Sequence, residues 1–125
     1  IPGLIAGAHD GTGMGILFLK HVERTSVLLH IIDISDEAHP GAWKNYTAIN
    51  KELKLYNPEL LDKPQIVTLN KIDLPFVRER VKKSVAQFFK KGIILHPFSA
   101  ATGEGLHDIL NQIITLLSHR DDLKA

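Results

Sequence analysis

Apolar and polar positions fall into blocks along the chain, and the length and spacing of these blocks predict its elements. Residues 27–34 and 64–70 form short apolar runs rich in β-branched side chains, which are typical of strands buried on both faces. A third strand is expected over residues 93–98, after Gly92 has ended the helix before it. The pattern therefore predicts three buried strands separated by helices.

Helical spacing appears in four segments. Residues 16–24 predict a short helix, and residues 42–56 predict a longer one that Asn57 and Pro58 stop. Pro75 opens a third helix at a first-turn position. The last helix begins near Gly105 and has the clearest apolar stripe in the chain: Leu106, Ile109, Leu110, Ile113, Ile114 and Leu117.

The order of these elements favours one fold class. Strands that alternate with helices through short connections form a parallel sheet with right-handed crossovers. We therefore expect an α/β fold of three layers, with helices on both faces of a parallel sheet. Ligands in such sheets bind beyond the carboxyl ends of the strands, which here are residues 33–35, 70–73 and 99–101.

Composition narrows the function classes. The 125 residues, 44% hydrophobic and 23% charged, fit one soluble domain. A net charge of +1 favours neither nucleic acid nor a membrane surface as partner, and no apolar run is long enough to span a membrane. Cysteine is absent, which excludes disulfides and thiolate chemistry, and the seven histidines never fall at metal-ligand spacing. We expect a cytoplasmic protein with no metal ligand in this chain.

The segment from Asn70 to Asp73 carries the most specific chemistry. A carboxylate presents two acceptor oxygens and no donor, so Asp73 matches the paired N1 and N2 donors of guanine and would repel adenine. Asn70 can reach the base or brace a neighbouring loop, and the Lys71 stem can lie over the base while its ammonium stays in water. The alternative is an ordinary strand–helix turn in which Asp73 caps the helix.

Two further segments add candidates. The small residues Ser99, Ala100 and Ala101 leave backbone N–H groups open to a base oxygen, and Ser99 can hold Asp73 or the turn in place. Gly3 has a backbone N–H that can approach a phosphate closely. Residues 1–15 contain five of the nine glycines and are expected to be a mobile loop or a frayed terminus. His9, in that loop, is a weak candidate for orienting water, with an exposed histidine as the alternative.

Together these residues resemble a P-loop GTPase, and in particular the Obg (CgtA) family. The glycine-rich start, Ile1-Pro2-Gly3-Leu4-Ile5 with Gly7-Ala8-His9 and residues 11–15, resembles the long switch II of that family. Residues 18–25, followed by residues 29–33, resemble the Obg sequence after that switch. The tetrad at residues 70–73 and the segment 99–106 match the two guanine-recognition motifs of GTPases. The resemblance makes the whole chain a partial GTPase domain, with a switch II region over residues 1–24 and a guanine-recognition half over residues 64–125.

The resemblance implies roles and partners. Asn70, Lys71 and Asp73 would bind the guanine and ribose side, and Ala100 would donate its N–H to the base oxygen with Ser99 in support. Gly3 would donate to the γ-phosphate of GTP. The protein would hydrolyse GTP to GDP and phosphate with Mg²⁺, whose ligands are expected outside this chain. Family members associate with the large ribosomal subunit during its assembly, and we expect a monomer.

The chain also departs from the GTPase pattern. The P-loop motif Gly-x-x-x-x-Gly-Lys-Ser/Thr is absent from it, along with the strands that would carry it, and Leu4 stands where Ras-like enzymes place a water-orienting glutamine. We therefore expect the 125 residues alone to be inactive. A guanine-nucleotide or ribosome-binding module without hydrolysis is one alternative, and a flavodoxin-like signalling or interaction domain is another.

Overall fold

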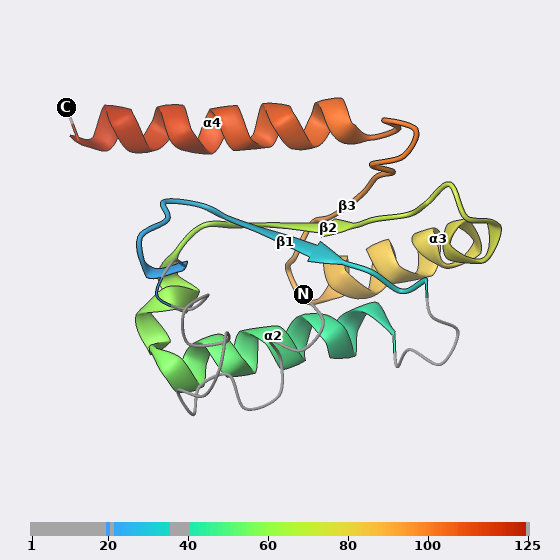
Figure 1. Ribbon diagram of the computed structural model, residues 1–125, viewed down its shortest axis with the longest axis horizontal. Helices are drawn as coiled ribbons and strands as arrows, with labels where there is room; N and C mark the ends of the chain where they lie inside the picture. Colours follow the sequence, from blue (N-terminus) through green and yellow to red (C-terminus); the bar gives the residue numbers. More distant parts are fainter. Residues whose placement is uncertain (1–19, 21, 36–40, 125) are drawn as a thin grey trace.

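The structure, a computed structural model, describes residues 20, 22–35 and 41–124, which form an α/β fold of three layers. Helix α4 lies along one face of a central sheet, and α2 and α3 lie on the other face (Figure 1). The elements in chain order are β1 (Leu28–Ile32), α2 (Ala42–Tyr56), the 3₁₀ helix η2 (Pro58–Asp62), β2 (Gln65–Leu69), α3 (Pro75–Lys90), β3 (Leu95–Pro97) and α4 (Leu106–Lys124). The expected fold class is confirmed.

The sheet is parallel, with the strand order β1-β2-β3. Ile32 pairs with Leu69, and Leu69 pairs with Pro97, so the last residues of the three strands stand side by side. All three strands are shorter than the apolar runs that predicted them. In each case the backbone leaves the hydrogen-bonded ladder before the apolar run ends. This alignment brings the three candidate segments of the sequence to one edge of the sheet.

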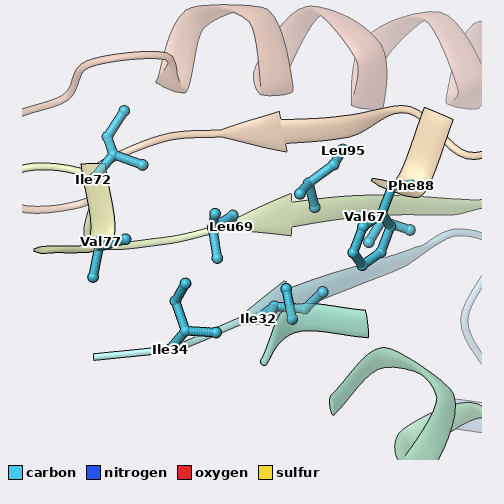
Figure 2. Packing of buried hydrophobic residues seen from close by; sticks show 9 residues of the cluster. Ile32, Ile34, Val67, Leu69, Ile72, Val77, Phe88 and Leu95 are labelled. Carbon is cyan, nitrogen blue, oxygen red and sulfur yellow. The ribbon is translucent and has the colours of Figure 1, made fainter. Parts of the chain in front are cut away.

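The main core lies between the sheet and the helices α2 and α3. Ile32 and Leu69 point into it from the strands, and Val77 and Phe88 meet them from α3; none of the four is exposed (Figure 2). Trp43 and the neighbouring Tyr46 pack against this cluster while half-buried, with the Trp43 ring edge-on to Phe88 at 5.1 Å. This packing fixes the sheet on which the candidate site stands.

The opposite face of the sheet is covered by α4. Under α4, Ile66 and Phe98 pack against Ile109. The rest of the predicted α4 stripe divides, because Ile113 packs against this cluster whereas Ile114 is 61% exposed. The apolar stripe of α4 has about two residues per turn and is wider than the part of the sheet that α4 contacts. The residues on one side of the stripe therefore stay exposed to solvent.

Strand β1 was expected to be buried on both faces, and this is wrong. Leu29 is 44% exposed and Ile31 is 49% exposed, although Ile32 is fully buried on the α2 side. Within the described part of the chain, β1 pairs only with β2, and α4 covers the middle of the sheet rather than this edge. The sequence showed that these side chains are apolar, but not which face lacks a covering helix.

Only the end of the expected helix over residues 16–24 is described. Lys20, Val22 and Glu23 are helical, and Val22 packs against Leu53 and Leu60 at the amino end of the sheet. None of the described helices is long and apolar enough to cross a membrane.

Candidate functional site

The carboxyl ends of the three strands place the candidate residues together. Asp33 and Ser35 follow β1, the tetrad from Asn70 to Asp73 follows β2, and Ser99 follows β3. Because the strands are parallel and adjacent, these segments meet at one edge of the sheet. Gly3 and His9 lie outside the described residues, so their roles stay predictions.

Asn70 braces two loops at once. Its Oδ1 accepts a hydrogen bond from the N–H of Lys71 at 2.7 Å and another from the N–H of Ala100 at 3.1 Å. Its own N–H donates to the Ile32 carbonyl at 2.9 Å, which anchors the start of the tetrad to β1. The bracing role considered for Asn70 is present. The Ala100 N–H, expected to meet a base oxygen, donates to Asn70 here, so a base bound there must share it.

Ser99 is fully buried and holds Asp73. Its hydroxyl donates to Asp73 Oδ1 at 2.7 Å and accepts from the N–H of Thr102 at 3.1 Å. Both contacts considered for Ser99 are therefore present. The Ser99 hydroxyl therefore fixes one side of the Asp73 carboxylate. Asp73 is an exposed residue, so its other side is open to solvent. A fixed, outward-facing carboxylate is suited to binding a ligand that presents paired N–H donors.

The backbone of Lys71 has a φ of +68°, a left-handed conformation that is uncommon for a residue with a side chain. The N–H of Lys71 is held by Asn70, and its carbonyl accepts from the N–H of Leu74 at 3.0 Å. The next residue, Ile72, is buried and donates its N–H to the Phe98 carbonyl at 3.3 Å. This turn directs Lys71 back toward β1, where its Nζ lies 2.8 Å from Asp33 Oδ2.

A second connection joins the tetrad to the loop after β3. Arg78 Nε donates to the Ile72 carbonyl at 3.0 Å, and the same guanidinium forms an ion pair with Glu104. Glu104 raises the pKa of Arg78, and Asp73 contributes more weakly in the same direction. Sequence reasoning missed Arg78; its position in the first turn of the helix after the tetrad was the available signal.

The grouping of possible metal ligands and the position of a cleft further characterise the described residues. Among the residues that the structure describes, no three His, Asp or Glu side chains are grouped so as to hold a metal ion. An open cleft of about 320 Å³ lies at the other end of the sheet, lined by Glu23, Leu60 and Lys63 among others. At the carboxyl edge, Asp73 and Ala100 are exposed to solvent.

Solved structures of other proteins share this fold. The structure resembles two structures of Era: Era in complex with MgGDPNP and nucleotides 1506–1542 of 16S ribosomal RNA, and a variant of Aquifex aeolicus Era bound to GDP·AlF4⁻. Both have a TM-score of 0.62 and 24% identity, and the match covers 89% of this chain and 35% of the Era chain. The fold is that of the P-loop GTPases.

The family follows from sequence relatives, although no family model matches the chain. GTPase Obg of Syntrophus aciditrophicus is 58% identical over 113 residues, which are 90% of this chain and 33% of that protein. GTPase Obg of Alkaliphilus oremlandii is 42% identical over all 125 residues, or 29% of that protein. The chain belongs to the Obg family of GTPases and spans about a third of the length of these relatives.

Proposed function

We propose that this chain recognises the guanine base within an Obg-type GTPase that hydrolyses GTP to GDP and phosphate. The observation that carries the proposal is the Asp73 carboxylate, held by the Ser99 hydroxyl at 2.7 Å in a residue that is exposed to solvent. In this arrangement Asp73 accepts hydrogen bonds from the N1–H and N2–H groups of guanine, and Asn70 joins the two recognition loops. Adenine offers an acceptor at N1, so the same carboxylate rejects it.

Hydrolysis and metal binding are assigned to other parts of the full-length protein. The described residues hold no P-loop and no cluster of metal ligands, so the phosphates and Mg²⁺ need groups beyond them. We propose residues 1–24 as the switch II region, with Gly3 as a γ-phosphate donor and His9 as a weak candidate for positioning water. Residues 64–125 form the guanine-recognition half.

The sharpest test is Asp73→Asn in the full-length protein, titrated with GDP, xanthosine diphosphate and ADP. The amide can donate a hydrogen bond to the xanthine carbonyl but cannot accept hydrogen bonds from both guanine N–H groups as the carboxylate does. GDP affinity should therefore fall about 10- to 100-fold, while affinity for the xanthine nucleotide rises. Asp108→Asn, an exposed aspartate in the first turn of α4, is the matched control. Unchanged GDP affinity in the Asp73 variant would remove Asp73 as the guanine reader.

We also propose that the full-length protein acts in the cytoplasm as a monomer that binds the large ribosomal subunit. The family resemblance supports this partner, and α3 with the residue after it supplies a suitable surface for a polyanion, with six basic residues and one acidic residue over positions 75–91.

Lys82→Glu with Lys83→Glu should weaken cosedimentation with large subunits, and the effect should shrink at high salt. Lys51→Glu with Lys54→Glu, an exposed pair on α2, should have a smaller effect. Equal loss in both pairs of variants would exclude α3 as the contact surface.

A further inference from the structure

Asp33, at the carboxyl end of β1, makes two separable contacts with its carboxylate. Oδ1 accepts a hydrogen bond from the N–H of Ser35 at 2.8 Å, which closes a local turn. Oδ2 lies 2.8 Å from the ammonium of Lys71, a residue of the tetrad that is 38 positions further along the chain. The first contact shapes the loop after β1, and the second crosses from β1 to the tetrad.

The cross-strand contact fixes a side chain that is otherwise free to move. Lysine has four rotatable side-chain bonds, and ordering them costs conformational entropy. Here the backbone of Lys71 is already fixed in its left-handed turn, and the far end of the side chain is held by Asp33. Ser35 adds a second acceptor, because its Oγ lies 3.3 Å from the same ammonium. Both ends of the Lys71 stem are therefore anchored.

The electrostatics keep this anchor in place across the neutral pH range. Partial burial acts to raise the pKa of Asp33, but the hydrogen bonds from Lys71 and Ser35 outweigh it and lower the pKa to about 2. Both side chains of the ion pair are 44% exposed. Ion pairs with that exposure contribute little to folding stability, so the stability of the protein does not account for this arrangement.

We propose that Asp33 is a positioning residue for guanine recognition, which orders the Lys71 stem so that its methylene groups are set against the base before a nucleotide arrives. The inference rests on the proposed function, because it assigns Lys71 to the base. It adds to the tetrad a fifth member, from a different strand, that touches no part of the nucleotide itself. The benefit is entropic, since a side chain that is already ordered loses less freedom on binding.

The test is a double-mutant cycle in the full-length protein, read as the Kd for GDP. Asp33→Asn keeps the acceptor for the Ser35 N–H and removes only the charge that holds Lys71. It should raise the Kd about three- to tenfold. Lys71→Met keeps an apolar stem and removes the ammonium, so adding Asp33→Asn to it should change the Kd by less than about twofold. Asp62→Asn, on the exposed end of η2, is the control.

The outcomes separate this inference from the function on which it rests. A parent protein without preference for guanine over adenine nucleotides contradicts the proposed function itself. If that preference is present, two results would overturn the inference. One is that Asp33→Asn binds GDP with the Kd of the parent; the other is that Asp33→Asn raises the Kd as much in the Lys71→Met variant as in the parent. Asp33→Glu restores the charge and should recover binding. If it remains as weak as the asparagine variant in a folded protein, the charge argument is wrong.

Discussion

His30 shows at the scale of one residue how the sheet treats a polar side chain. His30 Nε2 and Gln65 Oε1 are buried atoms of the described chain without a well-formed hydrogen bond. The ring packs 5.2 Å from Tyr46. Burial lowers the pKa of His30, and the neighbouring Gln65 side chain acts more weakly in the opposite direction. Protonation is therefore harder in the folded state.

This lowered pKa makes stability depend on pH. Because the unfolded chain binds a proton at His30 more readily, the free energy of unfolding is fully retained above about pH 6.5 and falls as the pH drops below it. Urea unfolding at pH 7.5 and 5.5, followed by the fluorescence of Trp43, measures this loss. His30→Gln should reduce the pH dependence, whereas the exposed His107→Gln should not. An unaltered pH dependence in the His30 variant would refute the assignment.

Some residues of the candidate site could be predicted from the sequence, and one of its contacts could not. Asn70, Asp73 and Ser99 were found because their spacing from buried strands fixes where they stand. The pairing of Asp33 with Lys71 was not found, since it depends on a left-handed backbone turn at Lys71 that is uncommon for lysine. The strand-end rule pointed to residue 33 as a neighbour but gave it no role.

At the scale of elements, the loop between β3 and α4 is closed by its own backbone. The Ser99 N–H donates to the Glu104 carbonyl at 2.9 Å, and the Gly103 N–H donates to the Ser99 carbonyl at 2.8 Å. The loop then turns so closely over β3 that a Cβ on Gly105 would stand 2.3 Å from the Pro97 carbonyl oxygen. Its geometry holds Ser99 and Ala100 beside the tetrad.

Two glycines of this loop give a matched pair of substitutions. Gly103 and Gly105 both have positive φ, at +86° and +77°, but open space surrounds only Gly103. Gly103→Ala should therefore cost about 1 kcal/mol of backbone strain. Gly105→Ala adds a clash with backbone and should cost about 2–4 kcal/mol in chemical denaturation, with weaker GDP binding. Equal losses in the two variants would mean that the close approach to Pro97 is not a constraint.

Sequence reasoning was most reliable at this scale for helices. The spacing of apolar residues placed α2 at its observed bounds, and Pro75 and Gly92 bracketed α3. The strands were shorter than their apolar runs because a strand extends only as far as the neighbouring strand can pair with it, and β3 has three residues. The 3₁₀ helix η2 was not predicted. Asn57 Oδ1 accepts a hydrogen bond from the Glu59 N–H at the start of η2. In the sequence, Asn57 and Pro58 indicated only the end of the preceding helix.

At the scale of the whole molecule, one face of the sheet is unevenly covered. Leu29 pairs with Ile66 in the parallel register, so both point to the face on which α4 packs. Ile66 is buried under that helix, whereas Leu29 and Ile31 are exposed. The exposed part of α4, which includes Leu110 and Ile114, adds further apolar surface. Among the described residues, β1 pairs on one side only, and a strand edge without a partner next to an apolar face favours association with another chain or segment.

We therefore expect the isolated 125-residue chain to self-associate, in a concentration-dependent way that sedimentation velocity detects, while the full-length protein stays monomeric. Leu29→Lys with Ile31→Lys should reduce association, because each charge makes burial of this face costly. Leu55→Lys with Leu61→Lys is the control, since these residues are 52% and 37% exposed but lie on α2 and η2. If the isolated parent chain stays monomeric, or if both pairs act alike, then the β1 face is not what drives association.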